Sequence, residues 1–222
     1  AVAIVKNMQP FLRPGFQARK LAEQELIGIV TNSTKNLVAP FGGFEPILGT
    51  NPLGFAIPFR GGVIVADFAT SKKANGEVKM AKLKNSELPD EVFFDSNGEY
   101  TTDPDAVYSI DVFGDYKGLA ISLLIEVLTG ALLGAEVGEK DGKSRNAMFL
   151  AIDPSKFGDY DDFLDKNAKL VERVKNSKTR EGMEVYYPGE RSQRIREENL
   201  GKGYFELSDE VVRALEDIEV QI

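Results

Sequence analysis

The residues best placed to do chemistry form a short polar cluster after an apolar run. Asp67 stands near the end of the strand-like residues 63–68, and Ala69, Thr70 and Ser71 follow. Free backbone N–H groups and the helix dipole make such a strand-to-helix junction a frequent position for anionic ligands. The small and hydroxyl side chains would leave room and supply donors for a ligand. The same residues could instead be an ordinary helix cap, because Asp and Thr are common caps.

Further candidates stand at two predicted helix starts. Lys117 lies in the run GDYKG, directly before a long apolar segment. A lysine there opposes the helix dipole unless an anion lies nearby, so it indicates a phosphate or carboxylate ligand. A solvated loop lysine is the alternative. The turn Gly189-Glu190-Arg191 leads into a basic helix, and by itself it is typical of a surface.

The residue types that are absent exclude several chemistries within these 222 residues. The chain has no histidine and no cysteine, which excludes a His-activated serine, a thiolate nucleophile and a His or Cys zinc site. Neither the Rossmann glycine fingerprint nor a P-loop occurs. We therefore predict no metal site and assign no catalytic residue. A net charge of −8 disfavours nucleic acid as a partner, and we expect a cytoplasmic protein.

One apolar segment, residues 118–135, invites comparison with a membrane span. It is shorter than the roughly 20 residues that a span needs, and Glu126 stands in its middle. We predict a buried core helix and no membrane partner. An unpaired buried carboxylate is costly, so we expect Glu126 to face a Lys or Arg, or to lie at a domain boundary.

Helices and strands alternate along the rest of the chain. Apolar runs predict strands at residues 2–6, 26–30, 53–58, 63–68, 147–152 and 182–187, the third and fourth forming a hairpin. Helical spacing predicts helices at residues 16–25, 69–83, 160–175, 191–200 and 208–218. This order indicates an α/β (α+β) class, with a mixed sheet and packed helices rather than a standard Rossmann fold. We expect a cofactor-binding core at 1–158 and a C-terminal helical segment at 159–222, packed on the core or swapped across it.

Six segments, taken in order, resemble one known family. They are LIGIVTNSTKNLVAPFGGFEPILGTNPLGFAIP, VIVADFATSKKANGEVKMAKL, DSNGEYTTDPDAV, FGDYKGLAISLLIEVLTGALLGA, MFLAIDPSKFG and YYPGER. The chain looks like the type-2 malate/L-lactate dehydrogenases, which include sulfolactate, ureidoglycolate and diketogulonate oxidoreductases. No single segment is decisive, but the ordered set is specific and covers nearly the whole chain.

The resemblance implies hydride transfer between NAD or NADP and a small 2-oxo or 2-hydroxy acid of the malate or lactate type, in a homodimer. It places the substrate near Thr31 and Asn32. Lys72 and Lys73 lean towards the 2′-phosphate of NADP without deciding the cofactor. The cofactor contacts that the resemblance implies are Asp67, Phe68, Ala69, Thr70, Ser71, Tyr116, Lys117, Gly189, Glu190 and Arg191.

Two departures from the family pattern leave the activity open. The family's N-terminal region, with its Ser-His-Gly segment and a nearby Arg, is absent from these residues. Pro10 stands where the family usually has a histidine, and a proline side chain cannot transfer a proton. The chain is then either part of a longer dehydrogenase or a catalytically degenerate relative that binds a nucleotide or serves in assembly.

Overall fold

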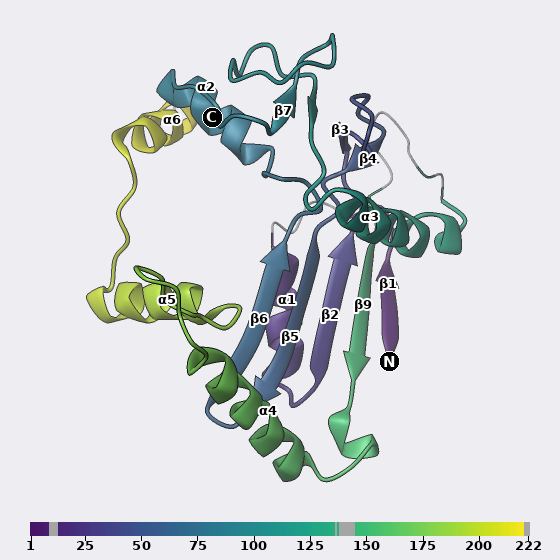
Figure 1. Cartoon of the computed structure of the whole chain (residues 1–222), viewed down its shortest axis with the longest axis vertical. Coiled ribbons are helices and arrows are strands. Elements are labelled where there is room, and N and C mark those ends of the chain that lie inside the picture. The colour runs from purple at the N-terminus through teal and green to yellow at the C-terminus, as the bar shows by residue number, and fades with distance from the viewer. Residues whose placement is uncertain (9–12, 136, 138–144, 220–222) are drawn as a thin grey trace.

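The computed structural model describes residues 1–8, 13–135, 137 and 145–219, so Pro10 lies outside the described residues. Helices alternate with short strands along the chain, and Figure 1 shows their arrangement. The helices are α1 (Pro14–Ala22), α2 (Gly76–Lys84), α3 (Tyr116–Thr129), η1 (Ala131–Leu133), η2 (Pro154–Lys156), α4 (Tyr160–Lys175), α5 (Glu190–Lys202) and α6 (Asp209–Glu219). The strands are β1 (Val2–Val5), β2 (Ile27–Asn32), β3 (Asn36–Val38), β4 (Leu48–Gly49), β5 (Leu53–Phe59), β6 (Gly62–Phe68), β7 (Phe93–Phe94), β8 (Ser109–Ile110) and β9 (Ala147–Ile152).

The larger sheet has five strands in the order β1-β9-β2-β5-β6, and every neighbouring pair is antiparallel. β5 and β6 form the predicted hairpin, in which Phe59 pairs with Gly62. Residues along β5 alternate between buried and half-buried, as the period of two in a strand requires. The sheet ends that carry Asn32, Leu53 and Phe68 lie together, because β2, β5 and β6 are neighbours.

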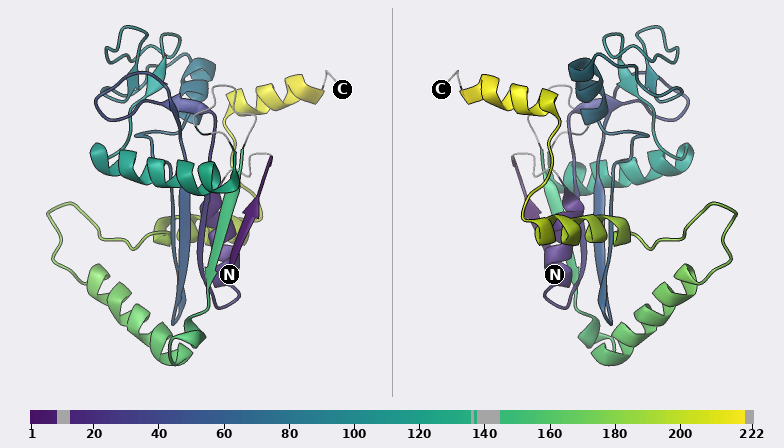
Figure 2. Two further views of the ribbon diagram at one scale, coloured as in Figure 1. Left: turned by 90° about the vertical axis from the view of Figure 1, so that its right-hand side faces the viewer. Right: turned by 90° about the vertical axis from the view of Figure 1, so that its left-hand side faces the viewer.

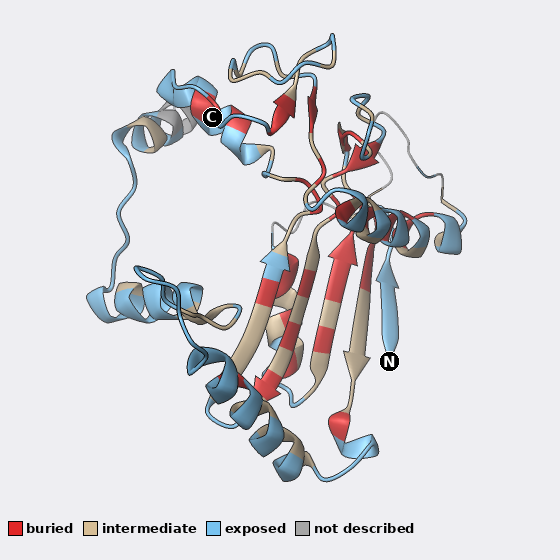
Figure 3. Cartoon of the chain, in the orientation of Figure 1, coloured by how far each residue is buried: buried red, intermediate tan, exposed pale blue. Residues whose placement is uncertain are grey.

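The smaller sheet has four strands in the order β4-β3-β8-β7, and it contains the parallel pair β3–β8. Its side chains share a core with α2, centred on Val38, Phe93 and Ile110. The predicted α/β class with packed helices is confirmed, and the mixed pairing lies in this smaller sheet. Figure 3 shows the buried residues concentrated in the two sheets, with α4 and α5 mostly exposed.

Helix α1 packs directly on one face of the larger sheet through two glycines. A side chain at Gly54 would place its Cβ 2.3 Å from the backbone nitrogen of Gly15. Ala18 and Ala22 are buried on the same side, against Val30. α1 begins at Pro14, earlier than residues 16–25 predict, because proline suits the first helical position. The N-terminus of α1 therefore lies beside the end of β6.

Helix α3 lies across the end of the larger sheet, where β2 ends (Figure 1). Only one of its faces is buried, formed by residues such as Ser122, Ile125 and Glu126, whereas Leu123 and Leu124 are about half exposed. The helix is confirmed, but burial throughout its length is not. By length and composition alone, residues Tyr116–Leu133 could cross a membrane, and one such helix is also common in soluble cores.

The structure differs from the prediction at two other elements. The helix predicted at 69–83 begins only at Gly76, because the preceding residues pair instead with neighbouring chain segments: Ser71 bridges Val112 and the Lys72 N–H donates to Asp111 O at 2.8 Å. Residues 182–187 form no strand. The Tyr187 ring packs edge-on against Phe59 of β5, and the carbonyl of Pro188, the next residue, accepts from the Val65 N–H.

The C-terminal helices lie around the larger sheet without entering it. α4 is held by Arg60, whose guanidinium pairs with Asp165 at 2.7 Å and Asp161 at 2.8 Å. The carbonyl of Pro188, before α5, accepts from Val65 N–H in β6 at 2.9 Å. α6 extends away from the sheet (Figure 2). The division of the chain into a core at 1–158 and a C-terminal helical segment at 159–222 stays a prediction.

Candidate functional site

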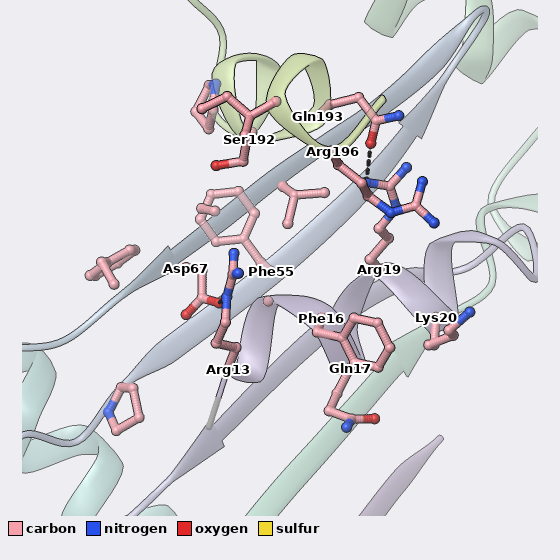
Figure 4. Close-up of a pocket in the computed structure, with 18 of the residues that line it drawn as sticks. Arg13, Phe16, Gln17, Arg19, Lys20, Phe55, Asp67, Ser192, Gln193 and Arg196 are labelled. Atoms are coloured by element: carbon pink, nitrogen blue, oxygen red, sulfur yellow. Dashed lines mark hydrogen bonds and ion pairs between the residues drawn. The ribbon is translucent and has the colours of Figure 1, made fainter. Parts of the chain in front are cut away.

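A groove of about 1900 Å³ runs between the end of the larger sheet, α1 and α5. Figure 4 shows several of the side chains that line it. The sheet side carries Asn32, Thr34, Thr50, Pro52, Phe55, Asp67, Phe68 and Ala69; the α1 side Arg13, Gly15, Phe16, Arg19 and Lys20; and the α5 side Gly189, Ser192, Gln193 and Arg196. The groove thus combines hydroxyl, aromatic and cationic groups.

The sheet side of the groove is tied together through Thr50. The Thr50 carbonyl accepts from the Thr70 N–H at 2.8 Å and from the Thr70 hydroxyl at 3.1 Å. The hydroxyls of Thr34 and Thr50 are 3.0 Å apart. Thr70 is fully buried, so its hydroxyl joins two segments rather than reaching a ligand.

Asp67 lines the groove and also meets the N-terminus of α1. Its carboxylate lies 3.6 Å from the Arg13 guanidinium and accepts from the Gly15 N–H. Burial raises the pKa of Asp67, and the positive charge of Arg13 opposes that rise. The cap alternative named Asp67 as a cap for the helix that follows it, whereas the structure brings it to a helix more than fifty residues earlier in sequence. Only the tertiary fold could join these two segments.

Gly189 borders the groove where α5 begins. Its φ is +94°, and a Cβ there would lie 2.8 Å from Val65 O. The next two residues face elsewhere: Glu190 pairs with Lys175 and accepts from the Tyr187 N–H at 3.3 Å, and Arg191 lies over the Tyr186 ring. Of the three residues predicted here, only Gly189 lines the groove.

The remaining predicted contacts lie outside the groove lining. Tyr116 and Lys117 stand exposed at the start of α3, with the Lys117 ammonium 5.9 Å from the Tyr116 ring centre. The Ser71 hydroxyl donates to Lys73 O at 2.6 Å. Thr31 is buried, and its hydroxyl donates to Pro52 O at 2.8 Å, whereas Asn32 does line the groove.

Sequence reasoning missed the cations of the groove. Arg19 donates to Gln193 of α5 and pairs with Glu23 at 3.4 Å, and Lys20 pairs with Glu23 at 2.9 Å. Arg196 has no ion pair among the described residues. The sequence shows three basic residues within positions 13–20, but no local pattern indicates that they face α5. Lys72, by contrast, pairs with Asp111 at 2.7 Å and does not line the groove.

Glu126 differs from its predicted role. Within the part of the chain that the structure describes, it has no Lys or Arg partner, and its carboxylate accepts from the Asn51 amide at 2.8 Å. It is buried beneath the sheet side of the groove. Among the described residues, no group of three or more acidic side chains could hold a metal ion.

Comparison with known proteins decides the family. Residues 1–216 match the family described as malate/L-lactate dehydrogenase. The chain belongs to this family. The malate/(S)-sulfolactate dehydrogenase of Methanothermus fervidus is 34% identical over 214 residues, which cover 92% of this chain and 62% of that protein. The ureidoglycolate dehydrogenase (NAD(+)) of Escherichia coli O157:H7 is 32% identical, over 89% of this chain and 59% of its own length.

The fold agrees with solved members. The sulfolactate dehydrogenase structure from Methanocaldococcus jannaschii has a TM-score of 0.82 at 32% identity, and the match covers 98% of this chain and 66% of that one. The chain therefore spans less than two thirds of the length of these relatives. One relative is named for NAD(+) and another, a (2R)-3-sulfolactate dehydrogenase of Chromohalobacter salexigens, for NADP(+). The family resemblance seen in the sequence is confirmed.

Proposed function

We propose that these residues form the cofactor-binding part of an NAD(P)-dependent oxidoreductase that transfers a hydride between the nicotinamide cofactor and a small 2-oxo or 2-hydroxy acid. Family membership supports the reaction class. The observation that carries the proposal is the groove, because four of the cofactor contacts implied by the resemblance line this one space: Asp67, Phe68, Ala69 and Gly189.

The lining fits the chemistry of a nicotinamide dinucleotide. Such a cofactor is long, with flat rings at both ends and phosphates between them, and it supplies the hydride when bound. Phe16 and Phe55 offer apolar ring surface. Arg19 and Arg196 offer guanidinium donors, which suit phosphate oxygens. Gly189 lets the start of α5 lie against β6 at the edge of the groove, because a Cβ there would stand 2.8 Å from Val65 O.

The proposed reaction also needs a side chain that transfers a proton, and histidine, the usual choice, is missing from these residues. Pro10 stands where the resemblance implies a histidine. We propose that the proton donor comes from residues beyond these 222. The proposal also includes a homodimer and substrate contacts at Thr31 and Asn32. It further includes a cytoplasmic location and the absence of nucleic acid and membrane partners.

Titration of NADH and of NADPH into the chain, followed by nicotinamide fluorescence and calorimetry, tests the cofactor site. We expect saturable binding of at least one cofactor. Arg196→Gln should weaken it, whereas Arg194→Gln should not, because Arg194 lies on the same helix over the Tyr186 ring and outside the groove lining. A larger loss for NADPH than for NADH in Arg196→Gln would assign that arginine to the 2′-phosphate. Failure of both cofactors to bind at millimolar concentration would refute the site.

The complete lack of histidine favours a second candidate, a degenerate relative that binds a nucleotide without turnover. Cofactor binding with no oxidation of malate, lactate or sulfolactate would be expected of it. Measurable turnover of any of these acids by the chain would exclude this candidate.

A further inference from the structure

A buried polar chain lies directly beneath the sheet side of the groove. Asn51 and Ser122 are fully buried, and Glu126 is 9% exposed. The Asn51 amide nitrogen donates to Glu126 Oε1 at 2.8 Å and to Ser122 Oγ at 3.0 Å. Its amide oxygen accepts from the Thr34 N–H at 3.3 Å. One amide thus joins helix α3 to the segment that follows β2.

An acceptor oxygen at position 126 holds this amide in its orientation. Glu126 Oε1 accepts from the Asn51 amide nitrogen, so the nitrogen end of the amide faces α3. The oxygen end is then left for Thr34. With an apolar residue at position 126, the amide would lose this constraint and one of its buried partners.

The orientation matters because Asn51 stands in a strained turn. Its φ is +31°, which is uncommon for a residue other than glycine and persists only where surrounding contacts hold it. The N–H of the preceding residue, Thr50, donates to the Thr34 hydroxyl at 2.8 Å, and the Thr50 carbonyl accepts from the Thr70 N–H at 2.8 Å. The segments after β2, before β5 and after β6 therefore meet at this turn.

We propose that Glu126 is a positioning residue for the cofactor groove. It does not line the groove itself but acts through Asn51 on Thr34 and Thr50, which do. The inference rests on the proposed function, because it takes the groove as the cofactor site. It gives a role to the acidic residue that stands alone in an otherwise apolar helix.

Four variants separate the hydrogen bond from the charge. Glu126→Ala removes the acceptor. Glu126→Gln keeps an acceptor oxygen for the Asn51 amide, so it should behave nearly as wild type. Asn51→Asp puts a second carboxylate beside Glu126, where the Asn51 amide nitrogen now lies 2.8 Å from Glu126 Oε1. Two acceptors then face each other, so this variant should lose the most cofactor affinity. Combining Asn51→Asp with Glu126→Gln restores one donor and one acceptor with their roles exchanged, and it should recover binding.

The first readout is the cofactor dissociation constant, measured well below the unfolding temperature and corrected for the folded fraction. We expect Glu126→Ala to weaken binding by roughly tenfold, as the loss of one buried hydrogen bond would. Ile125→Ala is the matched control, because Ile125 is buried on the same helix and outside the polar chain. It should lower the unfolding temperature without changing the dissociation constant. Equal binding losses in the two variants would overturn the proposal.

The second readout is amide hydrogen exchange, which needs no cofactor. Glu126→Ala should lose protection at the Thr34 and Thr70 N–H groups, while Glu126→Gln and Ile125→Ala retain it. If the wild-type chain binds neither NADH nor NADPH, the proposed function fails, and exchange still decides the positioning role. Unchanged protection at both threonines in Glu126→Ala would overturn it.

Discussion

The two sides of the groove are built differently. On the sheet side, Thr50 and Thr70 are hydrogen-bonded to each other, and the supporting Asn51 is fully buried. On the opposite side, α5 has no buried residue and is held by the Pro188 carbonyl, by the contact between Arg19 and Gln193, and by the pair of Lys175 with Glu190. Segments with few buried contacts open at low free energy, whereas densely bonded ones do not.

The difference in burial and hydrogen bonding separates residues that fix the shape of the groove from residues that are free to move. The sheet side is set when the chain folds, so substitutions there should change stability and binding together. The α5 side has its long side chains in solvent, so substitutions there should change binding with smaller effects on stability. The four predictions that follow test this division.

The largest effect is expected on the sheet side, at the crossing of α1 and β5. Gly54→Ala would put a Cβ 2.3 Å from the Gly15 nitrogen and 2.4 Å from the Pro14 carbonyl carbon, both of them backbone atoms. Overpacking against backbone should cost about 3 kcal/mol of unfolding free energy, measured by urea denaturation. Gly76→Ala is the control, because nothing lies within 4 Å of the added Cβ there. Equal stability of the two variants would contradict the close packing of α1.

The next effect is expected where α5 joins the sheet. Gly189 and Gly182 both have positive φ, at +94° and +72°, so alanine at either should cost about 1 kcal/mol from backbone strain. Of the two, only at Gly189 does the added Cβ also meet Val65 O, at 2.8 Å, and Gly182 lies outside the groove lining. Gly189→Ala should therefore weaken cofactor binding in calorimetry, while Gly182→Ala leaves it unchanged. Loss of binding in both would show that backbone strain alone is responsible.

Asp67 offers a pH-dependent test of the sheet side. Burial raises the pKa of its carboxyl above the ordinary 3.8, against the opposing charge of Arg13. The folded state then keeps this proton to higher pH than the unfolded state, so stability falls as the pH rises from 3.8 towards the raised pKa. Asp67→Asn should lack this fall, which thermal unfolding across that window would show. A wild-type-minus-variant stability difference that rises with pH would mean that Arg13 dominates instead.

The smallest effect is expected from the ion pair that holds the start of α5 to the end of α4. Lys175 and Glu190 are paired, and hydrogen bonding to Glu190 raises the pKa of Lys175. Lys175→Gln should lower the unfolding temperature only slightly, because solvent screens such exposed pairs. The difference should vanish in high salt. A salt-independent loss would mean that this lysine supports α5 by packing rather than by charge.

Local patterns were sufficient for the hairpin of β5 and β6 and for α4. Turn glycines at Gly61 and Gly62, a period of two in β5 and a helical period over residues 160–175 are properties of neighbouring residues. The same locality explains the errors. Residues 69–75 have helical composition, yet their backbone groups bond to Thr50 and Asp111, and no window of sequence contains both partners.

The sequence by itself determined the family and the α/β class, because these depend on the ordered residues and their spacing. The tertiary structure alone decided that Asp67 meets the N-terminus of α1, that Arg19 and Arg196 share a groove, and that Glu126 is paired with Asn51 rather than with a cation. The physical reason is that hydrogen bonds and charges act across space, and folding brings together groups that the chain keeps far apart.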